Sequence, residues 1–131
     1  MIERKSPLGA PEPQGPYSPA VRAGNFIFVS GQGAIDPVSG KLCTGTIEQQ
    51  TELVLNNVLL VLRGCGAGLA DIVKCSVFLE NASDFSAMNT VYASFFGASK
   101  PARTTVQAAL VEPGMKIEID CIAWLNEPRS G

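Results

Sequence analysis

The sequence predicts an α+β fold in which two helices cover one face of a mixed, mostly antiparallel sheet. Apolar side chains recur at helical spacing over residues 46–63 and 83–97. Residues 25–30, 72–79 and 101–124 instead carry compact β-branched runs or an alternation of apolar and polar side chains, which indicate strands. The expected element order is β-β-β-α-β-α-β-β. Both helices are then available to cover the same sheet face.

The length of 131 residues suits one well-packed domain and is too short for two of ordinary size. We therefore expect a single domain over residues 1–131, with an N-terminal arm over 1–16 and a polar tail over 126–131. The arm holds too many prolines and glycines for a regular element.

The composition narrows the range of partners. Ten basic and twelve acidic residues give a net charge of -2, so no basic surplus favours nucleic acid as a partner. Only 17% of the residues are charged and 46% are hydrophobic, which favours burial of surface in an oligomer. The N-terminus lacks the apolar segment of a secretory signal, and no run is long enough to span a bilayer. We expect a cytosolic protein, with import into mitochondria or another organelle left open.

Histidine is absent, and the four cysteines show no C-x-x-C spacing. This pattern argues against a zinc site and against a cysteine–histidine nucleophile. Cys75 and Cys121 fall at apolar positions of predicted strands, where a free thiol behaves as a small hydrophobe. We therefore expect reduced thiols in the core rather than disulfides.

The first elements of the chain are expected to be strands. Residues 17–22 fit a short edge strand, and residues 25–30 (NFIFVS) fit a buried one. The Gly-Gln-Gly sequence at 31–33 lacks the Lys-Ser/Thr ending of a phosphate-binding loop, so it predicts a bulge or a sharp exit from the strand. Residues 36–40 (DPVSG) predict a turn.

Two helices and a strand follow. The first helix begins with Thr46 and Gln49 at the spacing of a capping box, and two glycines stop it. The strand over 72–79 alternates apolar and polar residues, and a strand, helix and strand in sequence imply a right-handed crossover. The second helix has Ser83 as its expected cap and Gly97 as its stop. Its apolar stripe, typical of packing on a sheet, comprises Phe85, Met88, Tyr92, Phe95 and Phe96.

Residues 101–124 are expected to form an antiparallel hairpin around a Glu-Pro-Gly turn. With Gln107 opposite Glu118, the polar face of the hairpin carries both Arg103 and Glu118, roughly 13 Å apart at the usual strand rise. Two interpretations stay open. Both side chains are solvated on an exposed face, or another chain covers the face and Arg103 is kept for an anionic ligand.

The sheet face away from the helices would stay open in a monomer. It is expected to carry Phe28 or its neighbours, Phe78 and Trp124. Apolar side chains on an uncovered sheet favour association between sheets of different subunits.

Several motifs now point to one known family. They are Gly15-Pro16-Tyr17-Ser18, Phe28-Val29-Ser30-Gly31-Gln32, the helix over 48–61, Asp71-Ile72-Val73-Lys74 with Val77-Phe78-Leu79, Asp84-Phe85 with Asn89 and Tyr92-Ala93-Ser94-Phe95-Phe96, and Pro101-Ala102-Arg103-Thr104-Thr105-Val106 with Ile117-Glu118-Ile119. In these motifs, in order over nearly the whole chain, the sequence resembles the RidA family, also called YjgF/YER057c/UK114. The resemblance implies a chorismate-mutase-like α+β fold that assembles as a homotrimer with sites in the clefts between subunits.

The resemblance also implies an activity. RidA-like members hydrolyse reactive 2-imino acids, such as 2-iminobutyrate and 2-iminopropionate, or their enamine tautomers, to 2-keto acids and ammonia without a cofactor or metal. These intermediates arise from pyridoxal-phosphate dehydratases that act on serine and threonine, and their removal protects such enzymes from damage. The implied partners are the small 2-imino or 2-keto acid and further copies of the chain.

Site residues follow from the matched motifs. Arg103 matches the arginine that identifies deaminating members, and a guanidinium can hold a carboxylate through two charge-assisted hydrogen bonds. Glu118 matches the position thought to orient or activate water. Tyr17, Ser30 and Asn89 match positions that contact the substrate. Each also has a structural interpretation, because Tyr17 could anchor the arm, Ser30 could end a strand, and Asn89 could cap or pack its helix.

Two positions depart from the family pattern. Thr105 stands where many enzymatic relatives have cysteine. The substrate contact at that position is thought to come from the backbone carbonyl, so we expect hydrolysis to survive. Gly33-Ala34 replaces bulkier apolar residues, which would widen the pocket.

Two other function classes stay open. Some members of the family are described as ribonucleases that inhibit translation, although an acidic chain without histidine is poorly equipped for that chemistry. In a non-enzymatic alternative, the trimer binds small carboxylates or acts as a redox-activated chaperone. Release of ammonia from 2-iminobutyrate separates these alternatives from the deaminase.

Overall fold

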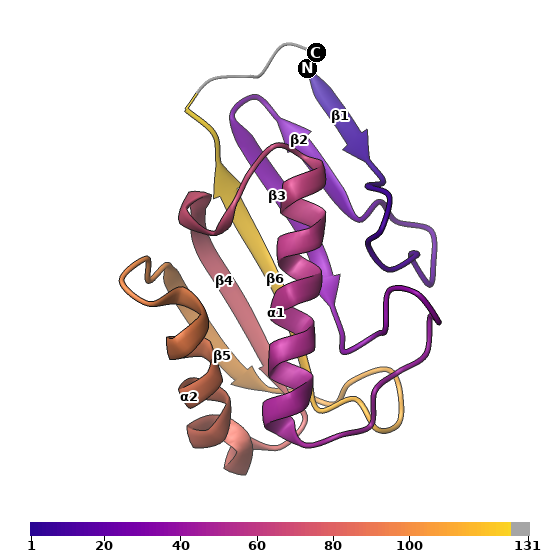
Figure 1. The fold of residues 1–131 in the computed structure, drawn as a ribbon, viewed down its shortest axis with the longest axis vertical. Coiled ribbons are helices and arrows are strands. Elements are labelled where there is room, and N and C mark those ends of the chain that lie inside the picture. Colours follow the sequence, from indigo (N-terminus) through magenta and orange to yellow (C-terminus); the bar gives the residue numbers. More distant parts are fainter. Residues whose placement is uncertain (127–131) are drawn as a thin grey trace.

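The computed structural model describes residues 1–126, which form a six-stranded sheet with two α-helices on one face (Figure 1). The strands are β1 (Ile2–Lys5), β2 (Ala20–Ala23), β3 (Phe26–Gln32), β4 (Ile72–Leu79), β5 (Ala102–Gln107) and β6 (Ile117–Trp124). The helices are α1 (Ile47–Gly64) and α2 (Phe85–Phe96), and two short 3-10 turns, η1 (Leu69–Asp71) and η2 (Ala82–Asp84), precede β4 and α2. The predicted polar tail lies outside the described residues from 127 onward.

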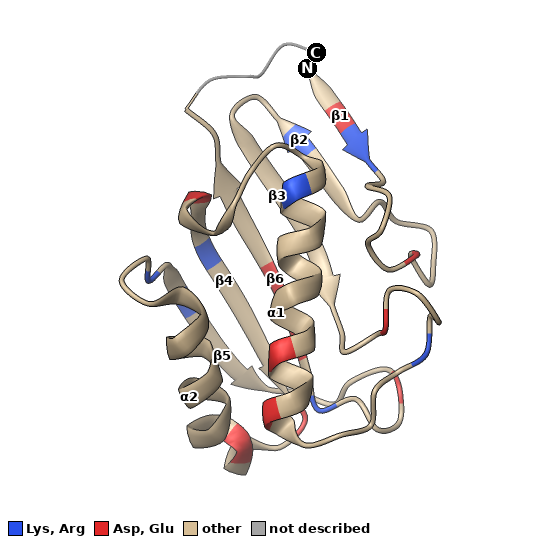
Figure 2. Ribbon diagram, viewed as in Figure 1, with Lys and Arg blue, Asp and Glu red and all other residues tan. Residues whose placement is uncertain are grey.

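The strands are arranged in the order β1-β2-β3-β6-β4-β5. Every neighbouring pair is antiparallel except β4 and β5, which are parallel. The buried core lies between the two helices and the sheet face that they cover. The predicted α+β class, with both helices on one face, is therefore confirmed. Within residues 1–126, neither helix combines the length and the apolar character needed to cross a bilayer, and acidic and basic residues are interspersed over the elements (Figure 2).

Helix α1 begins as its sequence predicts. The Gln49 N–H donates to the Thr46 side-chain oxygen at 3.1 Å, and the Thr46 N–H donates to the Gln49 side chain at 2.9 Å. This capping box satisfies two N–H groups that the first turn would otherwise leave unpaired. The stripe that faces the sheet is fully buried and comprises Val54, Leu55, Val58, Val61 and Leu62. Its burial removes apolar surface from water and fixes the helix on the sheet.

The buried side chain of Gln50 ties α1 to the segment before β6. It donates to the Gly114 carbonyl at 3.0 Å and accepts from the Lys116 N–H at 2.9 Å. Gln50→Leu would leave both backbone groups unpaired, so we expect a loss of about 3 kcal/mol in the free energy of unfolding. Urea unfolding at fixed protein concentration measures this loss. Glu52→Gln, at an exposed position on the same helix, is the control and is expected to stay within about 0.5 kcal/mol.

The predicted hairpin over 101–124 is wrong. β5 does not pair with β6 but lies at the sheet edge, parallel to β4. β6 instead lies between β3 and β4 and is antiparallel to both. The reason is the crossover through α2, which returns the chain to the end of the sheet where β4 began, so that the next strand runs parallel to β4. Residues 108–116 then carry the chain past β4 to the centre of the sheet.

This pairing separates the two charged residues that the hairpin would have placed on one face. Arg103 lies opposite Cys75, a buried residue of the helix-covered face. Glu118 lies opposite Phe78, which alternates with the buried residues of β4. Side chains of directly paired residues point to the same sheet face. Arg103 therefore lies on the helix side of the sheet and Glu118 on the open side.

Smaller differences have local causes. The predicted arm contains a regular element, because residues 2–5 precede its prolines and extend the sheet as β1. The predicted cap Ser83 lies within η2, whose own cap is Asn81: the Asn81 side chain accepts from the Ser83 N–H at 3.0 Å, and α2 begins at Phe85. A register shift in β4 exposes Val73 and buries Ile72, which reverses the predicted faces at that end. The predicted shift in β3 is confirmed and lies between Val29 and Gln32.

The open sheet face carries exposed aromatic side chains, as predicted. Phe26, Phe28 and Trp124 retain 44%, 44% and 39% of their accessible surface. The Phe26 and Phe28 ring centroids lie 6.3 Å apart. An uncovered cluster of large apolar side chains is typical of a surface that another chain covers.

Candidate active site

The residues expected at the site form two separate regions. The first, here called the Arg103 cluster, lies between β5 and α2 and comprises Arg103, Phe85, Met88 and Tyr92. The second, the Glu118 pocket, lies between β6 and the segment that precedes β2. Arg103 and Glu118, the two residues expected to carry the chemistry, are thus in different regions.

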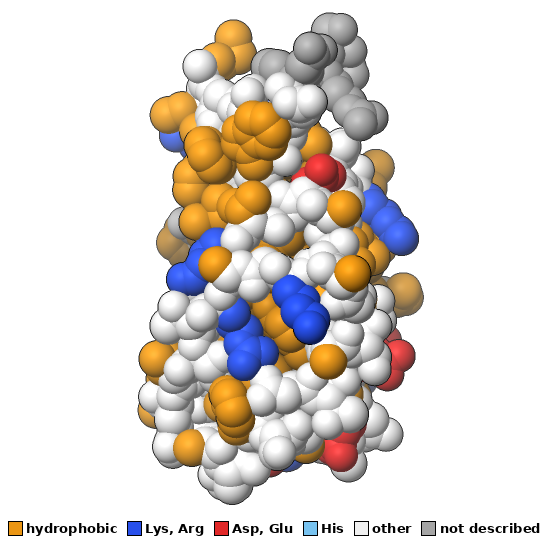
Figure 3. All heavy atoms as spheres, turned by 90° about the vertical axis from the view of Figure 1, so that its left-hand side faces the viewer, with side chains coloured by type: hydrophobic (Ala, Val, Ile, Leu, Met, Phe, Trp, Pro, Cys, Tyr) orange, Lys and Arg blue, Asp and Glu red, His pale blue; other side chains and the backbone are white. Residues whose placement is uncertain are grey.

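In the Arg103 cluster, the guanidinium lies against the apolar stripe of α2. Its Cζ is 4.7 Å from the Tyr92 ring centroid and 5.6 Å from that of Phe85, and its Nη1 is 4.0 Å from the Met88 sulfur. It forms no ion pair with a carboxylate of residues 1–126. Figure 3 shows this side of the molecule, where basic side chains lie around exposed hydrophobic ones near the middle of the view. The cluster therefore offers a positive charge whose hydrogen-bond donors are available to an anion.

Asn89 and Thr105 belong to the same region by position. Asn89 is half-buried and lies one turn after Phe85 on α2. Thr105 lies two residues after Arg103 on the same face of β5, and its buried hydroxyl has no hydrogen-bond partner within residues 1–126. A small cavity of about 130 Å³, lined in part by Thr105 and Phe85, adjoins it.

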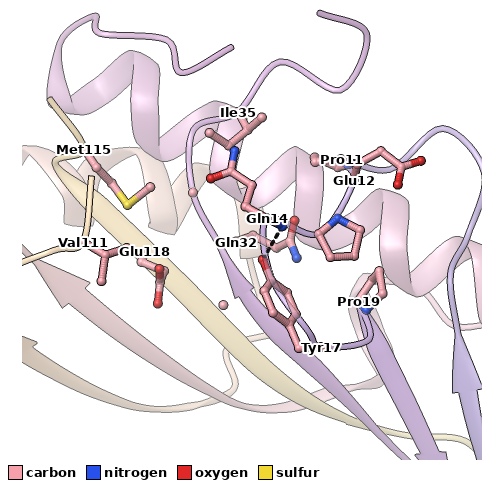
Figure 4. Close-up of a pocket in the computed structure, with 13 residues that line it drawn as sticks. Pro11, Glu12, Gln14, Tyr17, Pro19, Gln32, Ile35, Val111, Met115 and Glu118 are labelled. Atoms are coloured by element: carbon pink, nitrogen blue, oxygen red, sulfur yellow. Dashed lines mark hydrogen bonds between the residues drawn. The ribbon is translucent and has the colours of Figure 1, made fainter. Parts of the chain in front are cut away.

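The Glu118 pocket has a volume of about 200 Å³ (Figure 4). Tyr17 and Gln14, from the segment before β2, lie across it from Glu118 and Met115. The lining residues are Pro11, Glu12, Pro13, Gln14, Tyr17, Pro19, Gly31, Gln32, Gly33, Ile35, Val111, Met115 and Glu118. Its walls are largely apolar, with a few polar groups, as in many small-molecule sites.

Glu118 is half-buried in this pocket. Burial raises the pKa of its carboxyl, and the nearby negative charge of Asp120 raises it further. No basic side chain of the pocket lining compensates for the charge. A carboxyl in such surroundings takes up and releases protons closer to neutral pH than a solvated one, which suits a general base.

Because Gly31 has no side chain, the Glu118 carboxylate can lie directly against the backbone of residue 31. A Cβ at residue 31 would lie 2.5 Å from Glu118 Oε2 and 2.8 Å from its Cδ. We expect Gly31→Ala to displace the carboxylate and to lower kcat for the pocket's reaction by about tenfold or more. Gly68→Ala is the matched control, because its added methyl would meet no atom closer than 4.0 Å. Equal turnover by both variants would contradict this role for Gly31.

Tyr17 and Ser30 are held by local hydrogen bonds. The Gln14 N–H donates to the Tyr17 hydroxyl oxygen at 3.2 Å, and the Tyr17 N–H donates to the Gly15 carbonyl at 2.9 Å. The Ser30 hydroxyl donates to the Ser18 carbonyl at 2.7 Å. Tyr17 lines the pocket. Ser30 does not line it, and its hydrogen bond holds the segment that contains Tyr17 against β3.

Sequence reasoning missed several lining residues. One is Met115, whose methyl group fills the space beside Gly33, 2.6 Å from where a Cβ would be. Gly33 therefore does not by itself widen the pocket, and Ala34 is fully buried. The contribution of the proline-rich segment at 11–13 had no sequence signal. The helical spacing of Phe85, Met88 and Tyr92 could have indicated their shared contact with Arg103.

No group of three or more acidic or cysteine side chains suited to a metal ion occurs in the chain as far as residue 126. All four cysteines are free thiols, and Cys75 and Cys121 are buried in the core as predicted. Burial raises the pKa of both thiols, which keeps them protonated and unreactive.

The model of the family described as Endoribonuclease L-PSP matches residues 8–125 of the chain. The chain belongs to this family, the RidA/YjgF family. The RidA relative called Reactive Intermediate Deaminase A, chloroplastic, of Arabidopsis thaliana is 42% identical over 116 residues, which cover 88% of this chain and 62% of that protein. A goat (Capra hircus) protein called 2-iminobutanoate/2-iminopropanoate deaminase is 40% identical over 114 residues, which cover 87% of this chain and 83% of that protein.

RidA-family crystal structures share the fold. That of E. coli TdcF with bound serine superposes with a TM-score of 0.86 at 33% identity, and the match covers 94% of this chain and all of that one. The resemblance drawn from the sequence motifs is therefore confirmed. Names within the family include both deaminases and an endoribonuclease, so family membership supports a reactive-intermediate deaminase without specifying the reaction.

Proposed function

We propose that the protein hydrolyses small 2-imino acids to 2-keto acids and ammonia. The observation that carries this proposal is a guanidinium that has no carboxylate partner among residues 1–126 and lies against aromatic rings, together with a half-buried carboxylate in a largely apolar pocket. A 2-imino acid needs both groups, because its carboxylate requires a cation and its C=N carbon requires a placed water. The names of the Arabidopsis and goat relatives, and the serine bound to TdcF, support a small substrate with a carboxylate.

In the proposed reaction, Arg103 holds the substrate carboxylate through two parallel N–H donors. Glu118, ionised, accepts a proton from water while the water oxygen bonds to the imine carbon. The electrons of the C=N bond move to nitrogen, which takes up the proton that Glu118 accepted, and a tetrahedral carbinolamine results. Its C–N bond then breaks as the C=O bond forms, Glu118 passes the hydroxyl proton to the departing nitrogen, and ammonia leaves. Tyr17 and Asn89 complete the contacts with the substrate, and Thr105 contributes its backbone carbonyl.

The separation of Arg103 and Glu118 on opposite sheet faces supports a site shared between subunits. A second chain that covers the open face could bring its own Arg103 cluster to this Glu118 pocket. The family resemblance specifies three copies. The exposed aromatic side chains on the open face supply apolar surface for the contact.

Assembly and activity are expected to be lost together. Phe28 is 44% exposed on the open face, so Phe28→Glu places a charge in the proposed contact without disturbing the core. We expect the wild-type chain to have about three times the mass of its 13.8 kDa chain by light scattering, and Phe28→Glu to be smaller and inactive. Val38→Glu, at a position that is 96% exposed in a turn, is the control. A monomeric wild-type protein that still releases ammonia would contradict the shared site.

Ammonia release from freshly generated 2-iminobutanoate tests the proposed reaction, with spontaneous hydrolysis subtracted. A deaminase accelerates this release. A non-enzymatic carboxylate binder would bind 2-ketobutanoate without accelerating it, and a chaperone would suppress aggregation of a client protein only after oxidation. Absence of acceleration at any protein concentration would overturn the proposal.

The endoribonuclease description of the family gives a second candidate. The chain has no histidine for general acid–base catalysis of RNA cleavage, and its net charge of -2 gives no basic surplus for a phosphate backbone. Cleavage of RNA in a metal-free assay, without ammonia release from the imine, would favour that candidate instead.

We propose the cytosol as the location of the protein.

A further inference from the structure

The Arg103 guanidinium lies over two aromatic rings, and its only other side-chain contact among the described hydrogen bonds is a long one from Nη1 to the Met88 sulfur at 4.0 Å. Two aromatic rings of α2 lie at cation–π distances, 4.7 Å for Tyr92 and 5.6 Å for Phe85. These two residues and Met88 are spaced by three and four positions, so one stripe of α2 makes the whole contact. Within the described chain, no carboxylate pairs with Arg103.

This arrangement differs chemically from a salt bridge. A carboxylate partner would fix the arginine but would occupy its N–H donors and neutralise its charge. An aromatic ring attracts the cation electrostatically and leaves the donors in the guanidinium plane free. A substrate carboxylate can then take two donors at once.

The two rings have different surroundings. Tyr92 is 7% exposed, and its hydroxyl makes no hydrogen bond within the described chain. Burial raises the pKa of this hydroxyl, so it stays neutral and cannot act as a counter-ion. Phe85 is 45% exposed, far more than a core residue, although an apolar side chain at the helix start would be expected to turn inward. Both rings nevertheless present a face to the Arg103 cation.

We propose that Phe85 and Tyr92 are positioning residues that orient the Arg103 guanidinium for bidentate capture of the substrate carboxylate. This inference rests on the proposed function and deepens it. The rings do not touch the imine carbon. They act through the clamp, so they set the affinity for the carboxylate and not the rate of water attack.

The affinity for the product 2-ketobutanoate and the kinetics with 2-iminobutanoate test this role. Phe85→Leu is expected to raise Ki and KM by about 3- to 30-fold with kcat changed less than twofold. Phe85→Trp keeps an aromatic face and is expected to retain wild-type affinity. Tyr92→Phe, which removes only the unpaired hydroxyl, is also expected to behave like the wild type, whereas Tyr92→Leu is expected to follow Phe85→Leu.

A series of phenylalanine analogues at position 85 that differ in the charge distribution of the ring separates two roles. The ring either positions the Arg103 cation electrostatically or only fills space. Phenylalanine analogues with increasing numbers of ring fluorines keep nearly the same shape while weakening the negative ring face. If the ring holds the cation, Ki rises with each fluorine. A purely structural ring would leave Ki flat, and this result would overturn the inference even if Phe85→Leu altered assembly.

Arg103→Ala provides the reference for both proposals. If it abolishes turnover while the fluorine series and Phe85→Leu leave Ki unchanged, the positioning role is wrong and the proposed function stands. If Arg103→Ala retains turnover, the clamp itself does not exist, and the positioning role fails with it while the proposed reaction stands.

Discussion

Replacing Arg103 with alanine is expected to lower kcat/KM for 2-iminobutanoate by roughly 100-fold or more. The guanidinium has no carboxylate partner among the described residues, so the substrate carboxylate would lose both of its charge-assisted donors. Truncating one partner of a close charge pair costs about 2–5 kcal/mol, and each 1.4 kcal/mol is a factor of ten. Ammonia release under conditions where substrate is far below KM measures the change.

Two further variants test whether the loss of activity is specific to the guanidinium of Arg103. Arg103→Lys keeps the charge but loses the planar fork, so its activity is expected to fall between those of the wild type and the alanine variant. Lys74→Ala is the matched control, because Lys74 is a neighbouring cation, one residue before the Arg103 partner Cys75 on β4, but donates to Thr104 at 3.0 Å. Equal losses in Lys74→Ala and Arg103→Ala would show that general positive charge, and not a clamp, is responsible.

Glu118→Gln is expected to lower kcat by about 100-fold, since the amide cannot accept the water proton. In the wild type, kcat should fall as pH decreases through the Glu118 pKa, which burial and Asp120 raise above the usual 4.5. The variant should lack this acidic limb, because it has no carboxyl to titrate at that position. A pH profile of kcat for both proteins, after subtraction of spontaneous hydrolysis, makes the comparison. An unchanged acidic limb in the variant would exclude Glu118 as the base.

Glu118→Gln is expected to lower kcat but not to lower the stability of the fold. A carboxyl whose pKa is raised in the folded state is more stable folded when protonated. Its contribution is fully present below the unfolded pKa and is lost as pH rises through the folded one. Above that window the wild type carries the cost of a half-buried charge, so Glu118→Gln should unfold at an equal or slightly higher temperature near pH 7. A variant that is inactive and more stable would show that Glu118 serves function at a cost to stability.

Sequence reasoning was most accurate where the structure depends on near neighbours. The capping box of Thr46 and Gln49 operates within four residues, and α1 begins where it predicts. The alternation of β6 buries Ile117, Ile119 and Cys121, as the side-chain period requires. The motif resemblance identified the family, and with it Tyr17 and Glu118, which line one pocket.

The sequence by itself thus determined the two helices, most of the strands, the face that each residue of β6 occupies, and the family. The tertiary structure alone decided that β5 lies parallel to β4, and that Arg103 and Glu118 occupy opposite faces of one sheet. The physical reason is that an alternating pattern states which side chains of one strand share a face, while strand partners and directions depend on contacts between distant segments. Here the crossover through α2 sets those contacts.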